Sequence, residues 1–251
     1  MKLSEEMKNK TLLSFELFPP KTEKGLQNLP GTIDHLMKYN PSYISCTYGA
    51  GGGNVGANRE VCQMIKNAGT TPVTHFTVIK NTKEGIKEQL DQYLADGVDH
   101  MLALRGDIPL GETTTCGDFD YATDLVKFVR DTYGDKFEIA VAGSPEGHIS
   151  CRSLESDIAV LKQKQDNGAD YIMTQLCWDM EQFKYWLDAI RKAGITMPVD
   201  VGVMPILDQA ATINMALSRN GCVMDRELSR MISRHWLVSY PLSAKNAEGK
   251  P

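Results

Sequence analysis

Short apolar segments alternate with longer amphipathic segments along most of the chain, and this alternation constrains the fold more than any other feature. Seven candidate strands begin about 30 residues apart, which is the length of one strand–helix unit. They are residues 11–18, 42–49, 72–78, 100–106, 137–143, 170–177 and 198–205. The segments are rather continuously apolar, as expected for strands buried on both faces. The pattern therefore predicts an α/β protein with a parallel sheet.

Helical patterns lie between these strands. Residues 83–97, 154–170 and 181–194 carry apolar residues every three or four positions, and each has a glycine at or near its end that can close a helix. No linker or change of composition interrupts the series. We therefore expect one (β/α)8 TIM barrel domain over residues 1–251, with an open doubly wound sheet as the alternative.

The eighth strand–helix unit is the weak point of the barrel prediction. Two helical patterns follow residue 205, at 209–221 and 224–235, and the remaining strand-like segment, 236–240, is short and precedes Pro241. We expect the eighth unit to be missing or degenerate and residues 235–251 to form a divergent tail. Either another chain closes the barrel, or residues 236–240 substitute, or function is impaired.

Composition excludes several classes of protein. The chain is 42% hydrophobic and 24% charged, with a formal net charge of -5, which disfavours a nucleic-acid or anionic-membrane partner. No apolar run approaches the roughly 20 residues of a membrane span, and the charged first ten residues do not resemble a secretory signal. The six cysteines show no C-x-x-C spacing. We expect a cytoplasmic protein with reduced thiols and no metal site.

The segment GGGNVG at 51–56 satisfies the G-x-G-x-x-G pattern of dinucleotide-binding folds. Such a site also needs an acidic residue at the end of the next strand, to hold the ribose hydroxyls. That strand here ends in Val78, Ile79 and Lys80. The glycines are therefore better explained as a flexible loop at the mouth of a barrel.

Polar residues follow the apolar part of several predicted strands. In a barrel these carboxyl-terminal ends form one rim, where catalytic residues lie. Each residue alone could be a solvated loop residue, but their coincidence predicts a functional site. The positions are Glu16, Thr47, Tyr48, His75, Thr77, Arg105, Asp107, Ser144, Glu146, His148 and Gln175.

Two of these positions suggest specific chemistry. Glu16 is flanked by Phe15 and Leu17, and an apolar environment would raise its pKa and suit it to general acid catalysis; the alternative is a solvated glutamate on an outward face. Gly106 would allow close approach of a flat or phosphorylated ligand. Arg105 could then contact a phosphate, or it could pair locally with Asp107.

Several segments, in their order, resemble the bacterial methylenetetrahydrofolate reductases, and the resemblance spans about residues 11–234. They are SFELFPPKT at 14–22, TYGAGGG at 47–53, HFT at 75–77, ALRGDIP at 103–109, YATDLV at 121–126, SPEGH at 144–148, NGADYIMTQLCWD at 167–179 and GVMPIL at 202–207. The resemblance implies a (β/α)8 barrel with non-covalent FAD. NADH or NADPH reduces the flavin, which then reduces methylenetetrahydrofolate to methyltetrahydrofolate.

The resemblance also implies residue roles. Glu16 would be the general acid that opens the folate ring, and Asp107 would lie between flavin and folate as the second catalytic residue. Folate would be bound by Glu16, Thr47, Asp107 and Gln175. FAD would be bound by Thr47, Tyr48, Ala50, His75, Arg105, Gly106, Asp107, Tyr121, Ala122, Ala142, His148, Asp157 and Lys164. Departures from the family pattern are Ser144, Val160, Gln163, Cys177, Trp178 and the absence of the final strand with its folate-binding arginine.

Two alternatives to a folate-reducing enzyme remain open. One is a catalytically impaired flavin-binding or scaffold subunit that needs a partner chain to complete the barrel. The other is an unrelated barrel lyase or aldolase, which would need a Schiff-base lysine or metal ligands at strand ends. Only Lys80 comes near such a position. A homo-oligomer or a partner subunit is expected with either a reductase or a scaffold.

Overall fold

The computed structural model describes residues 2–20, 22–48, 55–108, 111–217, 224 and 228–232. Its strands are β1 (Ser14–Leu17), β2 (Tyr43–Cys46), β3 (Thr71–Thr77), β4 (His100–Leu104), β5 (Glu138–Gly143), β6 (Tyr171–Thr174) and β7 (Val199–Asp200). Its helices are α1 (Leu3–Met7), α2 (Glu23–Met37), α3 (Val55–Asn67), α4 (Lys83–Ala95), α5 (Ala122–Tyr133), α6 (Leu154–Asp166), α7 (Met180–Lys192) and α8 (Gln209–Leu217), with a 3-10 turn, η1, at Gly134–Lys136.

The strands form one seven-stranded sheet in the order β1-β2-β3-β4-β5-β6-β7. Each pair with a resolved register is parallel; Glu16 lies opposite Ser45, for example, and His75 lies opposite Leu102. Each strand falls within or next to its predicted segment, so the predicted α/β class and parallel sheet are confirmed. The strand-like segment 236–240 lies outside the described residues.

The predicted helices are confirmed as well. Residues 83–97, 154–170 and 181–194 contain α4, α6 and α7. Gly97, Gly168 and Gly194 follow these helices with φ values of 70°, 103° and 77°, in the left-handed region that favours glycine. Helix α8 lies in the predicted segment 209–221. Among the described helices, none combines the length and apolarity needed to cross a membrane.

Contacts within the chain divide it into two compact units. The first comprises Met1–Ala142, Ala159–Met173 and Gly194–Asp200, and the second comprises Gly143–Ile158, Thr174–Ala193 and Val201–Pro251. The first unit contains β1 to β4 and most of β5, so it positions most of the predicted site residues. The expectation of a single domain over residues 1–251 stays a prediction.

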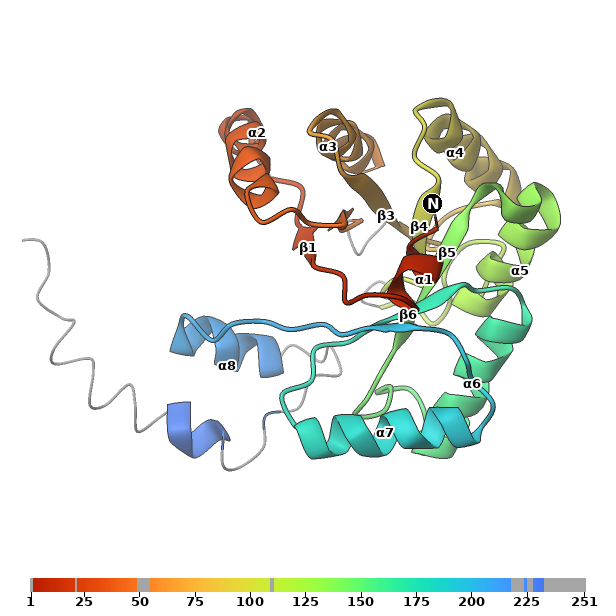
Figure 1. Cartoon of the computed structure of the whole chain (residues 1–251). Helices are drawn as coiled ribbons and strands as arrows, with labels where there is room; N and C mark the ends of the chain where they lie inside the picture. The colour runs from red at the N-terminus through yellow and green to blue at the C-terminus, as the bar shows by residue number, and fades with distance from the viewer. Residues whose placement is uncertain are drawn as a thin grey trace, which may run out of the picture. The chain divides into compact units, whose positions relative to one another are not determined.

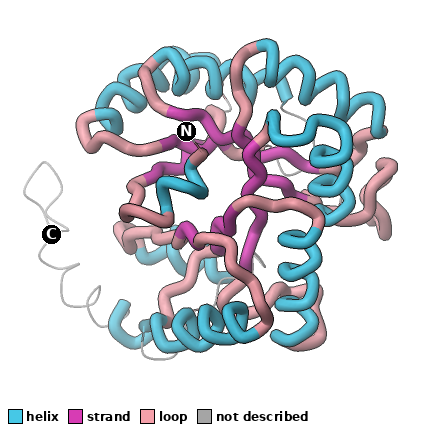
Figure 2. The backbone as a smooth tube through the Cα atoms, turned by 45° about the vertical axis from the view of Figure 1, so that its right-hand side comes forward, coloured by secondary structure: helices cyan, strands magenta, loops and turns pink. Residues whose placement is uncertain are grey.

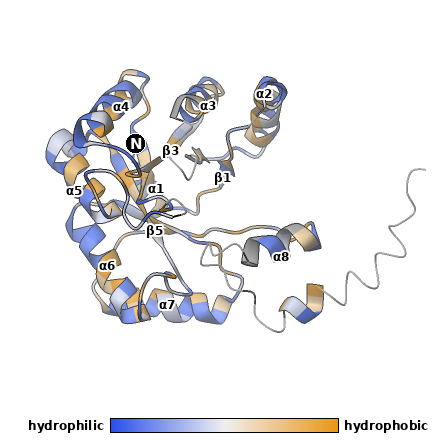
Figure 3. Cartoon of the chain, turned by 180° about the vertical axis from the view of Figure 1, so that it is seen from behind, coloured by the Kyte–Doolittle hydropathy of each residue, from blue (hydrophilic) through white to orange (hydrophobic). Residues whose placement is uncertain are grey.

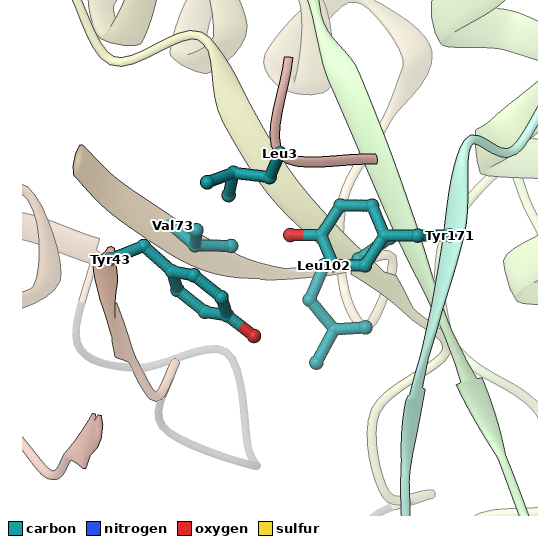
Figure 4. Close-up of a cluster of buried hydrophobic side chains, with 6 residues drawn as sticks. Leu3, Tyr43, Val73, Leu102 and Tyr171 are labelled. Atoms are coloured by element: carbon teal, nitrogen blue, oxygen red, sulfur yellow. The ribbon is translucent and has the colours of Figure 1, made fainter. Parts of the chain in front are cut away.

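The core of the first unit gathers one residue from each of β2 to β6 around the N-terminal helix. Leu3 of α1 packs with the strand residues Tyr43, Val73, Leu102, Ala140 and Tyr171 (Figure 4). The sheet must therefore curl around this cluster. The Asp200 carboxylate of β7 also accepts hydrogen bonds from the Ser14 hydroxyl of β1, at 3.2 Å, and from the Tyr43 hydroxyl of β2. The two ends of the strand order thus meet through side chains.

Helices cover the outer side of the curled sheet in this unit. Figure 1 shows α2, α3, α4 and α5 beside β1 to β5, and Figure 2 shows the strands on the inner side of these helices. Ile33, Ile65, Leu90 and Val126, one from each helix, are fully buried. Hydrophilic and hydrophobic residues alternate along the helices (Figure 3), as expected for helices that bury one face.

A buried ion pair holds α1 against the sheet. The Glu138 carboxylate accepts hydrogen bonds from the backbone N–H groups of Leu3, at 2.7 Å, and Ser4, at 2.8 Å. His100 Nε2 lies 3.0 Å from Glu138 Oε2, as an ion pair rather than a well-aligned hydrogen bond, and His100 Nδ1 lies 2.6 Å from Asp99 Oδ1. This arrangement fixes the helix that supplies Leu3 to the core.

Both partners of this ion pair have shifted pKa values. Burial lowers the pKa of His100, but the carboxylates of Asp99 and Glu138 outweigh burial and raise it to about 9. Burial raises the pKa of Glu138, but His100 and the N–H groups of Ser4 and Leu3 outweigh it and lower the pKa to about 2. Both groups are therefore charged over a wide range of pH.

The pair should make stability depend on pH at both ends of this range. The His100 contribution is complete below its ordinary pKa of 6.5 and is lost as pH rises through about 9. The Glu138 contribution is complete above its ordinary pKa of 4.5 and is lost as pH falls through about 2. Urea unfolding at a series of pH values should show that wild-type chain loses more stability between pH 6.5 and 9 than a His100→Gln variant. Equal losses of stability in the two proteins would show that charged His100 does not stabilise the fold.

Candidate functional site

The inner face of the curled sheet continues from the core toward the carboxyl ends of the strands. Side chains two residues apart on a strand share a face. Ser45 therefore shares the face of the core residue Tyr43, and His75 and Thr77 share that of Val73. These three polar side chains lie on the inner face, between the core and the strand ends.

Five buried side-chain atoms have no hydrogen-bond partner within the described part of the chain. Two of them belong to the core region: Tyr171 Oη in the core cluster and His100 Nε2 beside Glu138. The other three lie nearer the strand ends and are Ser45 Oγ, His75 Nε2 and Thr77 Oγ1. A buried polar atom without a partner costs about 1–3 kcal/mol, so such atoms are uncommon in native interiors. The three atoms nearer the strand ends lie on the neighbouring strands β2 and β3. Together they form a set of donors and acceptors that the polar edge of a flat ring would satisfy.

His75 is uncharged at neutral pH. Burial lowers the pKa of its imidazole to about 4. A neutral imidazole has one nitrogen that donates and one that accepts. His75 can therefore offer Nε2 as either a donor or an acceptor to a ligand without bringing a positive charge into the site.

Glu16 lies on β1, opposite Ser45 in the register. Its side chain is exposed to solvent, yet the protein around the carboxyl raises its pKa by desolvation. Because solvent still reaches the group, the rise is limited. The direction agrees with the expectation from the apolar sequence around it, and it favours the protonated form that a general acid needs.

The segment after β4 contains Arg105, Gly106 and Asp107. Arg105 Nε donates to the Gly106 carbonyl at 3.2 Å, and among the described residues no carboxylate lies within ion-pair distance of its guanidinium. The local Arg105–Asp107 pair considered from the sequence is therefore not formed. The guanidinium charge is available for an anionic ligand, and the Asp107 side chain is exposed.

Gly106 is required at its position. Its φ of 85° lies in the left-handed region, and a Cβ there would come within 2.5 Å of Ile79 Cγ1 and 3.2 Å of Thr77 Cβ. Thr77 carries one of the buried unpartnered oxygens. A side chain at residue 106 would therefore push on the inner face of the site.

Gly106→Ala should destabilise the chain more than a comparable glycine substitution elsewhere. We expect a loss of about 2–4 kcal/mol, of which about 1–2 kcal/mol comes from the left-handed backbone and the rest from crowding against Ile79 and Thr77. Gly69→Ala is the matched control, because Gly69 also has a positive φ, 96°, but no atom within 4 Å of the added Cβ. Urea unfolding of both variants measures the difference. Equal losses would show that crowding contributes nothing.

Thr47 and Tyr48 leave the end of β2. The Thr47 N–H donates to the Leu17 carbonyl at 2.9 Å, which continues the pairing with β1. The Tyr48 ring is buried against Phe76, and its hydroxyl donates to Gln89 Oε1 at 2.9 Å. The Tyr48 side chain therefore belongs to the packing between the sheet and α4. Ala50 lies outside the described residues.

The remaining predicted contacts of the first unit lie on β5, α5 and α6. Lys164 Nζ donates to the Ala142 carbonyl at 2.9 Å, so these two predicted residues come together. Tyr121, just before α5, is 61% exposed, and its N–H donates to the Asp124 carboxylate at 3.0 Å. Ala122 begins α5. Tyr121 offers an open aromatic face rather than a buried one.

Five predicted residues belong to the second unit: Ser144, Glu146, His148, Asp157 and Gln175. The Asp157 carboxylate accepts a hydrogen bond from the His148 N–H at 3.1 Å, and His148 Nδ1 accepts one from the Ser150 N–H at 3.2 Å. The Gln175 N–H donates to the Gly143 carbonyl at 2.7 Å, and the Gln175 side chain is half-buried. The structure thus brings Asp157 to His148 and places Gln175 beside the end of β5.

Two residues were missed by the sequence interpretation. Ser45 is a polar residue inside an apolar run, two positions before Thr47, so the period of a strand could have revealed it. Asn58 is fully buried on α3, four and seven positions before Cys62 and Ile65 on the same face, so the period of a helix was a signal too. Across the described ranges, no group of three or more His, Cys, Asp or Glu side chains is arranged to hold a metal ion.

Comparison with known proteins identifies relatives. The family model described as methylenetetrahydrofolate reductase matches residues 2–228. Methylenetetrahydrofolate reductase (NADH) 1 of Arabidopsis thaliana is 38% identical over 82% of this chain and 37% of its own length. The 5,10-methylenetetrahydrofolate reductase of Escherichia coli is 34% identical over 80% of this chain and 67% of its own length. The chain thus spans little more than a third of the plant relative and two thirds of the bacterial one.

Solved structures show the same fold at low sequence identity. A protein from Clostridium thermocellum, which binds two copies of 5-methyl-5,6,7,8-tetrahydrofolic acid, matches with a TM-score of 0.62 and 13% identity, over 96% of this chain and 88% of its own. A 2,3-dimethylmalate lyase matches with a TM-score of 0.55 and 12% identity, over 99% of this chain and 96% of its own. At these identities the likeness concerns the fold alone. The family model and the relatives above 30% identity decide the assignment: the chain belongs to the methylenetetrahydrofolate reductase family.

Proposed function

We propose that this chain is a flavin-dependent oxidoreductase that reduces methylenetetrahydrofolate to methyltetrahydrofolate with a nicotinamide as electron donor. The observation that carries the proposal is the row of buried unpartnered atoms on Ser45, His75 and Thr77, in a chain of this family. Glu16, whose pKa is raised, lies opposite Ser45 on the neighbouring strand. The proposed architecture is a (β/α)8 barrel, in agreement with the curl of the parallel sheet.

The residues present fit FAD as the cofactor. Bound FAD would supply the hydride transfer between nicotinamide and folate. Ser45, His75 and Thr77 would satisfy the polar edge of the flavin ring. Arg105, with no ion-pair partner in the described residues, would offer charge to the pyrophosphate, as would Lys164, and the neutral His148 would donate a hydrogen bond from Nε2. Asp157 would accept hydrogen bonds from ribose or adenine groups.

Glu16 is the proposed general acid. In its protonated form it would donate its carboxyl proton to a ring nitrogen of methylenetetrahydrofolate, so that the five-membered ring opens to an electrophilic iminium ion. Asp107 and Gln175 would orient the folate by hydrogen bonds to its pterin, and Thr47 would contact it from the end of β2. These roles follow from the family motifs, and the placement of Glu16 on the inner side of β1 supports them.

Names of the relatives favour NADH as the first donor to test. The plant relatives from Arabidopsis thaliana, Oryza sativa and Zea mays carry NADH in their names. NADPH remains the alternative donor. We further propose a cytoplasmic enzyme without a nucleic-acid or membrane partner, acting as a homo-oligomer or with a partner subunit.

Product formation tests the proposal. Purified chain loaded with FAD should form methyltetrahydrofolate from NADH and methylenetetrahydrofolate, measured by mass spectrometry, whereas heat-denatured chain should not. FAD binding without product, at any protein concentration, would instead favour the flavin-binding subunit that needs a partner. Light scattering on the same sample gives the molar mass of the assembly that forms the product. A chain that binds no FAD would contradict the proposal.

A further inference from the structure

Asn58 is a buried side chain beside the candidate site that makes hydrogen bonds in four directions. It lies on α3 and is 0% exposed, among the buried residues Val61, Cys62 and Ile65 of the same helix. A polar amide at such a position is retained only if its donors and acceptor are satisfied. The partners of Asn58 therefore show what the side chain does.

The amide nitrogen of Asn58 holds the end of β2. Asn58 Nδ2 donates to the carbonyl oxygen of Cys46 at 3.0 Å and to that of Thr47 at 3.1 Å. Cys46 is the last residue of β2, and Thr47 is the first residue beyond it. Both hydrogens of the amide are thus used on two consecutive carbonyls where the chain leaves the strand.

The amide oxygen of Asn58 accepts from neighbouring elements. Thr74 Oγ1 of β3 donates to Asn58 Oδ1 at 2.8 Å, and Tyr93 OH of α4 donates at 2.7 Å. The Cys62 thiol of α3 lies 3.6 Å from the same oxygen. The hydroxyl donors on one side and the carbonyl acceptors on the other fix the orientation of the amide. Asn58 therefore joins β2, β3, α3 and α4 at one point.

This point coincides with the end of the β2–β3 pairing. Cys46 and Thr74 are the last register pair of the two strands. At this point the carbonyls of Cys46 and Thr47 both accept from the Asn58 amide. The direction in which the chain leaves β2, and so the position of Thr47, depends on the Asn58 amide.

We propose that Asn58 is a positioning residue for the flavin site. It does not contact the ligand; its amide fixes the end of β2 so that Thr47 and Ser45 face the ligand in one geometry. The inference rests on the proposed function, because Thr47 is a site residue only if the chain binds the flavin. A residue that acted on stability alone would leave the affinity of the folded protein for FAD unchanged.

Asn58→Asp tests the proposal. The variant keeps the size of the side chain and an oxygen for Thr74 and Tyr93, but it replaces the NH2 group that holds the two carbonyls by an acceptor. Tyr93→Phe is the matched control, because it removes one hydrogen bond to Oδ1 and leaves both carbonyl contacts. The dissociation constant of FAD and the visible circular dichroism of the bound flavin are measured on full-length chains, well below their melting temperatures.

We expect Asn58→Asp to weaken FAD binding by about tenfold or more and to change the flavin spectrum, since a lost hydrogen-bond pair is worth at least one factor of ten. Tyr93→Phe should lower the melting temperature but change the FAD dissociation constant by no more than about twofold. Equal FAD affinity in wild type and Asn58→Asp, or equal weakening in both variants, would overturn the positioning role.

Two further proteins separate the possible failures. If Asn58→Asp does not fold, Asn58→Thr replaces it. A hydroxyl can donate to at most one of the two carbonyls, so at least one contact is lost. An FAD dissociation constant equal to that of wild type would then overturn the positioning role. His75→Phe removes a proposed flavin contact and should weaken binding in any case. Wild-type chain that binds no FAD would overturn the proposed function together with this inference. FAD binding that is sensitive to His75 but not to Asn58 would overturn the inference alone.

Discussion

Replacing Glu16 by glutamine should reduce the folate half-reaction by about 100-fold or more, while the reduction of bound flavin by NADH changes by less than about threefold. Glutamine has the shape of protonated glutamate but no acidic proton to give to the folate nitrogen. The nicotinamide step needs no such proton, so it should survive. Anaerobic stopped-flow measurement of flavin absorbance follows the two half-reactions separately.

The pH dependence sharpens this test. Because the acid acts in its protonated form, the wild-type folate half-reaction should slow as pH rises through the raised pKa of Glu16. Glu16→Gln should lack this dependence. Glu84→Gln, an exposed glutamate on α4, is the matched control and should leave both half-reactions unchanged. A parallel fall of both half-reactions in Glu16→Gln would mean that Glu16 supports the structure or the flavin and is not the acid.

Glu138→Ala should lower the free energy of unfolding by about 3–5 kcal/mol, a large part of the stability of an ordinary domain. The substitution leaves the imidazolium of His100 buried without its Glu138 partner, and it removes the acceptor of the Leu3 and Ser4 N–H groups. Helix α1 should then detach and expose the core around Leu3. Urea unfolding monitored by circular dichroism measures the loss.

A surface ion pair provides the comparison for Glu138. Glu181→Ala removes the partner of Lys184, and both of those side chains are mostly exposed, so a loss below about 1 kcal/mol is expected. Glu138→Gln keeps an acceptor oxygen for only one of the Leu3 and Ser4 N–H groups, and its loss should fall between the two. A loss in Glu138→Ala no larger than that in Glu181→Ala would show that the buried pair does not hold α1.

The strands were predictable because a parallel sheet buried on both faces needs continuous apolar runs. The same reasoning overextended the last strand. Residues 198–205 are apolar, but β7 ends at Asp200, and Val203 is 79% exposed. Apolar composition shows that a segment can be buried, whereas its pairing partner decides whether it forms a strand. The helix ends were easier to predict, because Gly97, Gly168 and Gly194 adopt the positive φ that favours glycine after a helix.

The candidate site was predictable only in part. Strand ends identify which residues can face a ligand, and His75 and Glu16 lie where that rule places them. The ion pair of His100 with Glu138 and the amide of Asn58 depend on partners far apart in sequence, which no local pattern reveals. Tyr48 shows the converse, since its sequence position suggests a ligand contact but Phe76 and Gln89 take up its side chain.

One anaerobic titration tests the central claim most directly. The FAD-loaded chain is first bleached with one equivalent of NADH, and methylenetetrahydrofolate is then added in the absence of oxygen. The account predicts that the oxidised flavin spectrum returns in step with the formation of methyltetrahydrofolate. A flavin that stays bleached, or a chain that gives no flavin spectrum at all, would contradict it.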